Sequence, residues 1–369
     1  MKCFSCLRKG VALALFVLLL GLSACGKQPE VVSPSPEPSS PEESSSLPLP
    51  IVPEPDPEPV YISPTTGREF SKQREFYPIL VMIENSRDAR PQTGLMQADV
   101  VYEAPVESTI TRFACLFNDT LPTVAGPVRS ARMYYLGIQQ EWDSIFMHYG
   151  GPKLEGSEAT VYGRKYDYIR VRINGIQGKY DKFFWRSKDR KSPHNVYTDL
   201  TFVREQYPDF VSGRTQHWKF SATPSTSSTT ASRIDIPFVS SKTPNVEFAY
   251  DTATGTYLRY ENGEPFYTYT FADNGKESQK QQVAVKNLVV AYLPMRTLSD
   301  ADHHRIFNMI GEGKCEFFIG GKQITGTWAR KSASDITRYY DEAGEEICFA
   351  PGNTWVAIQP KDKTIRVTP

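Results

Sequence analysis

Short apolar runs separated by turn residues follow one another from about residue 60 onward, and they predict strands more often than helices. In the first part of this region the predicted strands are 78–83, 98–103, 109–117 and 144–149. The run 78–83 is almost wholly apolar, which is typical of a strand buried on both faces. One clear helix is expected, beginning at Gly126-Pro127 because proline is favoured at the first helical position, and ending near Glu141. This mixture predicts an α+β or α/β N-terminal domain.

Strand signals alone dominate the second part of the chain. The predicted strands are 246–250, 256–260, 287–292, 315–319 and 355–358. The Asn262-Gly263 pair, directly after the second of these runs, is a strong hairpin-turn signal. The pattern predicts a mostly antiparallel β C-terminal domain.

Composition shifts divide the chain into five predicted segments. They are a signal peptide (1–24), a tether (25–60), an N-terminal domain (61–215), a Ser/Thr-rich connector (216–235) and a C-terminal domain (236–369). A length of 369 residues is enough for two ordinary domains, since a domain takes roughly 100–200 residues.

The N-terminal segment has the features of a lipoprotein signal. Lys2, Arg8 and Lys9 precede an apolar run over 11–22, which is shorter than the roughly 20 residues that cross a bilayer. The run ends in Leu22-Ser-Ala-Cys25, a bacterial lipobox pattern, so we expect acylation of Cys25 and a lipid bilayer as the first partner. The alternative is a plain secretory signal in which Cys25 is incidental.

The next segment is expected to be an extended tether. Residues 26–60 contain eleven prolines, with Ser and Glu between them. At about 3.1 Å per residue such a chain reaches on the order of 100 Å. It would hold the globular part away from the outer face of a cell membrane.

Charge excludes one class of function. The 42 Lys and Arg balance the 42 Asp and Glu, which argues against a nucleic-acid binder acting through bulk positive charge. Three cysteines, Cys115, Cys315 and Cys348, remain beyond the tether, too few for a disulfide scaffold. Cys315 and Cys348 are close enough in sequence to pair, whereas Cys115 is expected to be a small buried hydrophobe.

Several segments resemble the family of YerB-type lipoproteins. The resemblance to its N-terminal domain is carried by 83–86, 89–95, 98–103, 110–113, Gly-Pro-Val-Arg-Ser-Ala-Arg at 126–132 and Pro-His-Asn-Val-Tyr at 193–197. The resemblance to its C-terminal domain is carried by 311–314, 326–328 and Gly-Asn-Thr-Trp at 352–355. It implies a bacterial, membrane-anchored lipoprotein. It implies no reaction and no catalytic residues, because both domains are of unknown function.

The strongest candidate site contains arginines near the start of the expected helix. Arg129 and Arg132 would share a face within its first two turns, where the helix dipole already favours anions. We expect them, together with Arg112, to bind a phosphate or carboxylate. The alternative is a structural network in which internal carboxylates neutralise them; the candidates are Asp99, Glu103 and Glu107.

Other polar residues give weaker signals. Glu103 and Glu107 would suit a glycosidase acid/base pair, although Pro105 between them leaves their separation open. Glu84 with Asn85 follows a buried strand and is either a functional group or a strand-end cap. His148 should share a strand face with Phe146 as a half-buried, hydrogen-bonded histidine.

The remaining candidates are His194 and Asn195, in a basic stretch with Arg186, Lys188, Arg190 and Lys191 that would contribute to the same anion site. His303-His304 lack partners at metal spacing, so no metal is expected, and no cofactor. Trp185, Trp328 and Trp355 could stack on sugars, but aromatic residues are more often part of the core. No common hydrolase or nucleotide-binding motif is present.

These observations favour a non-catalytic, lipid-anchored extracytoplasmic protein that binds an anionic envelope component or a membrane protein. The alternatives are an envelope glycopolymer hydrolase or transferase, with Glu103 or Glu107 as acid/base, and a purely structural partner in a membrane complex. A pocket uniting Glu103, Arg129 and His148 would favour the enzyme.

Overall fold

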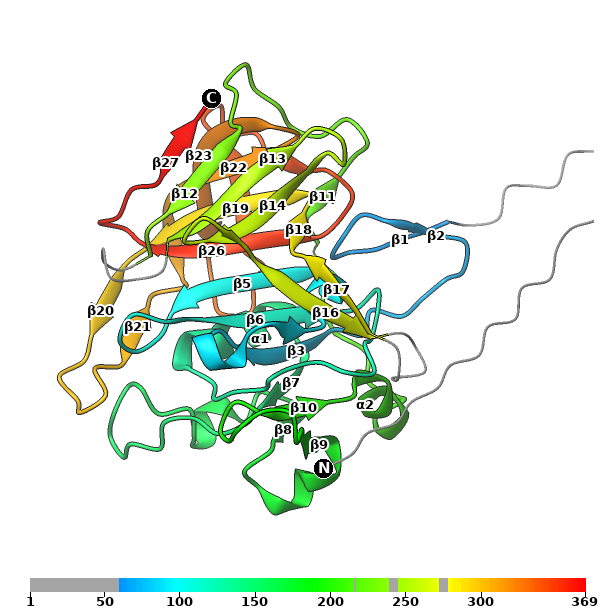
Figure 1. Cartoon of the computed structure of the whole chain (residues 1–369), viewed down its shortest axis with the longest axis vertical. Coiled ribbons are helices and arrows are strands. Elements are labelled where there is room, and N and C mark those ends of the chain that lie inside the picture. Colours follow the sequence, from blue (N-terminus) through cyan, green and yellow to red (C-terminus); the bar gives the residue numbers. More distant parts are fainter. Residues whose placement is uncertain (1–59, 216, 239–244, 272–277) are drawn as a thin grey trace, which may run out of the picture. The chain divides into compact units, whose positions relative to one another are not determined.

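A ten-stranded β-sheet runs through both halves of the chain in the computed structural model (Figure 1). The structure describes residues 60–215, 217–238, 245–271 and 278–369. The predicted signal peptide, Cys25 and the tether up to residue 59 lie outside the described residues. In spatial order the strands are β24 (Arg338–Asp341), β23 (Lys322–Arg330), β22 (Gly311–Ile319), β19 (Asn287–Leu293), β26 (Thr354–Pro360), β5 (Val100–Pro105), β6 (Thr111–Phe117), β3 (Ile79–Glu84), β7 (Ile145–His148) and β8 (Arg172–Asn174).

The two halves of the chain meet where β26 pairs in parallel with β5. Thr354 lies opposite Val100, and Ala357 lies opposite Glu103. Segments 61–215 and 236–369, which we expected as separate domains, therefore contribute adjacent parts of one sheet (Figure 1).

Strand direction differs between the halves. In the first half β5, β3, β7 and β8 run the same way, and β6 opposes its neighbours β5 and β3. In the second half β22, β23 and β24 are antiparallel, while β19 is parallel to β26. The second half is thus mainly antiparallel, as expected. The first half is not a clear α+β or α/β domain, because strands dominate it and the described chain is mostly β.

The central strands are buried on both faces. Along β3, Leu80 and Met82 belong to one apolar cluster, and Val81 and Ile83 belong to the other. Side chains alternate across a strand, so two covered faces require an apolar residue at every position. This is why the run 78–83 has no polar residue.

The predicted helix begins later than expected. It is α1 (Met133–Trp142), and Arg132 is its N-cap residue. The backbone N–H groups of Val128 and Arg129 donate to the carbonyls of Val196 and Met82, so this segment is extended between the strands β10 (Val196–Thr198) and β3. The prediction that Arg129 and Arg132 lie in the first two turns of a helix is therefore wrong, because strand pairing outweighs the local Gly-Pro signal.

The helices are few and short. Besides α1 there is α2 (Leu200–Gln206), which begins after Asp199, whose carboxylate accepts from the N–H groups of Thr201 and Phe202. The 3₁₀ helices are η1 (Arg87–Ala89), η2 (Leu95–Gln97), η3 (Arg164–Tyr166) and η4 (Gly178–Phe183). No helix among the described residues has the length and apolar character needed to cross a membrane.

A second sheet covers one face of the large one. Its order is β15 (Glu264–Pro265), β14 (Thr256–Glu261), β13 (Val246–Asp251), β12 (Arg233–Ile236) and β27 (Arg366–Thr368), and β18 (Ala284–Val285) pairs with β14. Phe248 from this sheet packs edge-on against Trp355 of the large sheet. Asn262 and Gly263, with φ of 54° and 81°, form the predicted hairpin turn between β14 and β15.

A three-stranded sheet joins the halves a second time. Its order is β17 (Ser278–Gln282), β16 (Tyr267–Phe271) and β4 (Gln92–Thr93). The remaining strands form pairs: β1 (Tyr61–Ile62) with β2 (Glu69–Phe70), β9 (Phe184–Arg186) with β10 (Val196–Thr198), β11 (Lys219–Phe220) with β25 (Cys348–Phe349), and β20 (Met295–Thr297) with β21 (Arg305–Phe307).

A buried ion pair lies where the halves meet, and we call its environment the seam: Glu103, Thr111, Arg259, Phe266 and Trp355. Nη2 of Arg259 lies 3.1 Å from Oε1 of Glu103, and both side chains are fully buried. Thr111 Oγ1 and Trp355 Nε1 also donate to this carboxylate, at 2.6 and 3.1 Å.

The Arg259 guanidinium also has an aromatic neighbour, since its carbon lies 3.8 Å from the ring centroid of Phe266. Burial raises the pKa of Glu103, and the charge of Arg259 opposes that rise. The pair therefore depends on both partners being present.

We predict that Arg259→Met lowers the free energy of unfolding by about 3–5 kcal/mol, because it leaves the Glu103 carboxylate buried without a counter-charge. Urea denaturation would measure this loss, and the double variant with Glu103→Gln should recover part of it. The matched control is Arg296→Met, whose partner Glu158 is exposed like Arg296 itself, so its cost should stay below about 1 kcal/mol. Equal losses for the two arginine variants would contradict the prediction.

Candidate functional site

Arg129 lies beside the end of β3. Its Nε is 3.5 Å from Oε1 of Glu84, a carboxylate that is only 2% exposed. The same oxygen accepts a hydrogen bond from Ser86 Oγ at 2.9 Å and lies 3.0 Å from Nδ1 of His194. Glu84 therefore brings two of the predicted site residues, Arg129 and His194, together.

Arg132 pairs with Glu107, one of its expected counter-charges. Nη2 of Arg132 donates to Oε2 of Glu107 at 2.6 Å, and a second contact joins Nε to Oε1. Burial by itself would raise the pKa of Glu107, but the hydrogen bonds and charge of Arg132, with the charge of Arg112, lower it to about 2. Nε2 of His304 lies 3.7 Å from the same carboxylate.

Arg112 is buried below the segment that precedes α1. Its Nη1 donates to the carbonyl oxygen of Ser130 at 2.8 Å. Burial, and then the charge of Arg132, lower the pKa of Arg112 to about 10, so it remains charged at neutral pH. All three predicted arginines thus have a partner inside the protein.

His148 is fully buried and hydrogen-bonded. Its ring stacks on Phe146, as expected from their shared strand face, with centroids 4.9 Å apart. Its Nε2 accepts from Arg172 Nε at 2.9 Å, so Nδ1 carries the proton and donates to the carbonyl of Gly150 at 2.7 Å. Burial and the charge of Arg172 lower the pKa of His148 to about 3, so the ring is neutral at physiological pH.

Asn195 fixes the loop between β9 and β10. Its side-chain oxygen accepts from Arg186 at 2.8 Å, and its amide donates to the carbonyls of Ser187 and Arg190 at 3.0 and 3.3 Å. It therefore positions the basic stretch rather than the arginines near α1.

Glu103 lies on the opposite face of the sheet from the other candidates. Ala104, next to it on β5, packs in the apolar cluster that contains α1, whereas Glu103 contacts Arg259 of the second sheet. Arg112, paired in register with Ala104, shares the helix-covered face. The pocket uniting Glu103, Arg129 and His148 that an enzyme would require is not formed by these described side chains.

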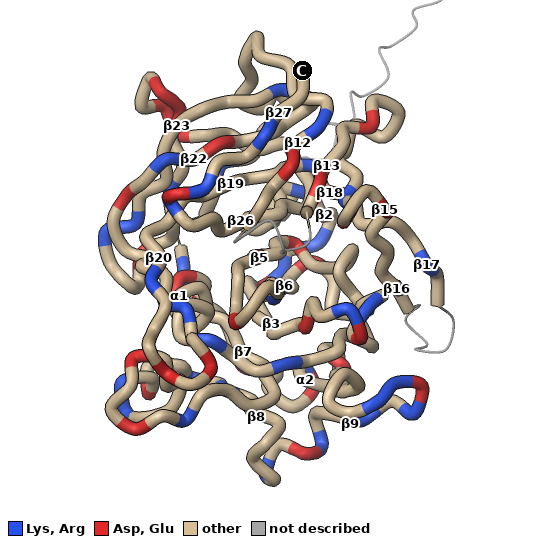
Figure 2. Tube along the Cα trace, turned by 60° about the vertical axis from the view of Figure 1, so that its left-hand side comes forward, with Lys and Arg blue, Asp and Glu red and all other residues tan. Residues whose placement is uncertain are grey.

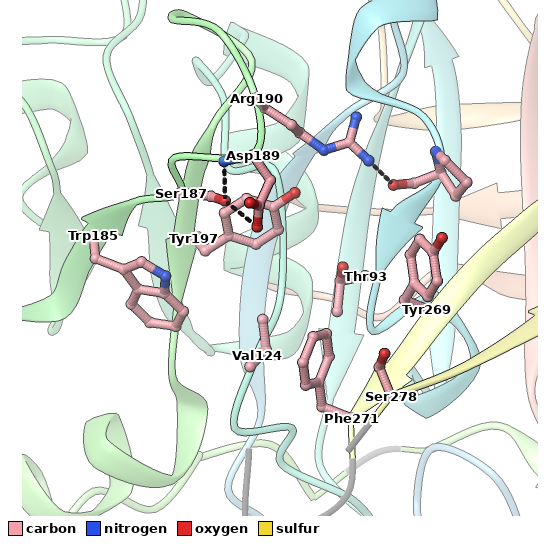
Figure 3. A pocket seen from close by; sticks show the side chains of 11 residues that line it. Thr93, Val124, Trp185, Ser187, Asp189, Arg190, Tyr197, Tyr269, Phe271 and Ser278 are labelled. Atoms are coloured by element: carbon pink, nitrogen blue, oxygen red, sulfur yellow. Dashed lines mark hydrogen bonds between the residues drawn. The ribbon is translucent and has the colours of Figure 1, made fainter. Parts of the chain in front are cut away.

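A cavity of about 600 Å³ opens between the β9–β10 pair and the β16–β17 hairpin (Figure 3). Trp185 and Tyr269 lie on opposite sides of it, with Thr93 and Val124 between them (Figure 3). The residues lining it are Pro91, Thr93, Val124, Trp185, Ser187, Asp189, Arg190, Tyr197, Tyr269, Phe271 and Ser278. Aromatic side chains thus form much of its wall, and hydroxyl and charged groups are interspersed among them.

Strand pairing explains why distant residues meet at this cavity. Tyr197 lies opposite Trp185 across the β9–β10 pair. Tyr269 lies opposite Thr93, because β16 pairs in parallel with β4, and Thr268 Oγ1 donates to the carbonyl of Gln92 at 3.0 Å. The walls therefore come from both halves of the chain.

Basic residues gather on the loop after β9 (Figure 2), and this loop contributes Ser187, Asp189 and Arg190 to the cavity wall. Arg190 is held by the protein, since it donates to the carbonyls of Asp88 and Arg90 at 3.0 and 3.1 Å and to that of Pro91. Lys188 and Lys191 are exposed, and neither has an ion-pair partner within the described part of the chain. These two ammonium groups remain available to an anion.

Only one wall of this cavity could be predicted from the sequence. Trp185 and the basic stretch are recognisable in the sequence as candidates for a site. Tyr269 and Phe271 alternate with threonines as in any strand, so the sequence does not indicate that they line a cavity.

Within the described ranges no three His, Cys, Asp or Glu side chains are grouped to hold a metal ion. Cys115, Cys315 and Cys348 are free, so the pairing considered for the last two is absent.

We predict that the Arg132–Glu107 pair makes stability pH-dependent. The folded-state pKa of Glu107 is about 2, below the ordinary value of 4.5, so the ion pair contributes about 3 kcal/mol above pH 4.5. That contribution should decline below pH 4.5 and vanish near pH 2. Urea denaturation of the protein and of Glu107→Gln at a series of pH values would show their difference in stability shrinking over this interval. A difference independent of pH would rule the prediction out.

Two family models match the chain, one in each half. Residues 65–211 match "Protein of unknown function (DUF3048) N-terminal domain", and residues 234–356 match the corresponding C-terminal domain. The chain is 30% identical over 304 residues to "Putative lipoprotein YerB" of Bacillus subtilis (strain 168), covering 81% of this chain and 86% of that protein. The crystal structure of YerB from Bacillus subtilis is similar, with a TM-score of 0.67 and 27% identity, covering 84% of this chain and 100% of that one. The chain therefore belongs to the YerB-like lipoprotein family, whose two paired domains are of unknown function.

Proposed function

We propose that this protein is a non-catalytic lipoprotein, anchored through acylated Cys25 on the extracytoplasmic face of the membrane, that binds an anionic carbohydrate of the cell envelope. The observation that carries the proposal is the aromatic-walled cavity with unpaired cations beside it. Its volume of about 600 Å³ is in the usual range of roughly 300–1,000 Å³ for ligand sites.

The composition of the cavity wall favours a sugar. The face of a pyranose ring presents C–H groups that pack on aromatic rings, while its hydroxyls need hydrogen-bond partners around the edge. Trp185, Tyr269 and Phe271 supply the rings, and Thr93 and Asp189 supply polar groups. Trp and Tyr suit such a ligand because each combines a large apolar surface with a polar atom.

Charge favours an acidic sugar over a neutral one. The ammonium groups of Lys188 and Lys191 are exposed beside the cavity, and Asp189 is the one carboxylate among its lining residues that the structure describes. Their summed field attracts anions and speeds their association. The anionic ligand inferred from the sequence thus has a better-placed site here than at Arg129 and Arg132, which have internal carboxylate partners.

The same arrangement supports binding rather than hydrolysis. Glycosidases usually place two carboxyl groups on either side of the scissile bond. Glu103 and Glu107, the carboxylates considered for that role, pair with Arg259 and Arg132 and do not line this cavity. Among the residues that the structure describes, this cavity therefore has no pair of free carboxylates for the enzyme alternative.

We predict that Trp185→Ala and Tyr269→Ala each weaken binding of anionic polysaccharide by about tenfold, or roughly 1.4 kcal/mol, because each removes one stacking surface. The probe is the anionic polysaccharide released from Bacillus subtilis cell walls, titrated calorimetrically into the full-length acylated protein in detergent micelles. Tyr168→Ala is the matched control, since Tyr168 is an exposed aromatic side chain outside this cavity.

One further variant and one further experiment separate the alternatives. If Arg129→Gln abolishes binding while the cavity variants retain it, the site lies at the arginines near α1 instead. If the polysaccharide does not bind and the full-length protein retains a membrane protein in a crosslinking pull-down, the partner-protein alternative replaces this proposal.

We also predict that the protein incorporates an alkyne-tagged fatty acid in bacterial cells and that Cys25→Ser abolishes the labelling, because the thiol is the acylation site. Membrane fractionation should show the variant released from the membrane. Labelling that survives the substitution, or a mature N-terminus at any other residue, would contradict the assignment of the anchor.

A further inference from the structure

Trp185 separates the large cavity from a second, smaller one. The second cavity has a volume of about 130 Å³, and Trp185 belongs to the wall of both. Its other lining residues include Tyr149, Asp181, Phe184 and Arg186. The indole is 41% exposed, so it stands at the surface between the two hollows.

The position of Trp185 is fixed by its neighbours. It pairs across β9 and β10 with Tyr197, and the two rings are nearly parallel at 25°, with centroids 6.3 Å apart. Tyr197 itself is only 8% exposed, so it provides a buried support beneath the indole. An exposed ring that is supported in this way is a preorganised stacking surface.

The two cavities repeat the same kinds of groups. Asp189 and Arg190 are among the residues that line the larger one, and Asp181 and Arg186 are among those that line the smaller one. Each also has aromatic walls, Tyr269 in the larger cavity and Tyr149 in the smaller, where the guanidinium carbon of Arg186 lies 5.2 Å from the Tyr149 ring centroid. A ligand made of repeated units would meet similar chemistry on both sides of Trp185.

We infer that the ligand is a carbohydrate chain that crosses Trp185 and occupies both cavities, rather than a single sugar or a chain end held in one of them. This inference rests on the proposed function and specifies the substrate class as an internal stretch of an anionic polymer. Two linked subsites bind a connected ligand more tightly than either subsite alone, because the second contact is intramolecular.

The test uses fragments of graded length from the same Bacillus subtilis wall polysaccharide, prepared by partial acid hydrolysis and titrated into the full-length acylated protein. Affinity should rise by at least about tenfold between monosaccharide fragments and fragments long enough to cross Trp185. Arg186→Gln should weaken binding of the long fragments and leave that of the shortest unchanged, because Arg186 lines only the smaller cavity. Trp185→Ala should remove the rise with length.

The outcomes distinguish failure of this inference from failure of the proposed function. Equal affinity for all lengths, or an Arg186→Gln variant that weakens short and long fragments alike, would overturn the inference and leave the proposed function intact. Failure of the intact polysaccharide to bind would overturn the proposed function and this inference together. Tyr168→Ala, outside both cavities, should match the unaltered protein at every length.

Discussion

The structure depends on the buried pairing of Glu103 with Arg259 where the two halves of the chain meet. The buried Glu103 carboxylate is stable in such a place only with a counter-charge, because alone it would be a desolvated charge. Arg259 supplies that charge, and it also lies 3.4 Å from a second carboxylate, that of Glu261. Strand β5 carries one partner and β14 the other, so the ion pair forms only when the second sheet lies on the large one. The hydrogen bond from Trp355 to Glu103 ties β26 to the same point. The two domains are consequently parts of one folded unit.

The strands could be predicted from the sequence because burial on two faces leaves a clear local mark. The run 78–83 is one example, and the Asn262-Gly263 turn is another, since both follow from side-chain chemistry within a few residues. The start of α1 could not be predicted in this way. Gly126-Pro127 is a sound local signal for a helix, but the following residues donate their backbone hydrogen bonds to strands distant in the chain. A local pattern contains no information about such a partner.

At the candidate site, too, the local sequence does not identify the distant residues that come together. The arginines were conspicuous in sequence, and their internal partners Glu84 and Glu107 became evident only from the fold. The sequence offers Glu107 as a counter-charge, whereas it indicates only a functional group or a strand-end cap at Glu84. The sequence indicates only the cavity wall that contains Trp185 and its basic neighbours. Its other wall comes from β16, more than 80 residues later in the chain, and it is placed by the parallel pairing of β16 with β4.

The basic residues near the candidate sites differ in whether the protein itself already pairs them. Arg112, Arg129 and Arg132 are occupied by oxygen atoms of the protein, so an incoming anion would have to displace a carboxylate or a carbonyl. The ammonium groups of Lys188 and Lys191 are exposed to water, so an anion that bound them would displace only solvent. Because the cavity walls come from both halves of the chain, a ligand bound there adds its binding free energy to the contacts that hold the halves together. A ligand bound at the proposed site would therefore add to the stability of the joined halves.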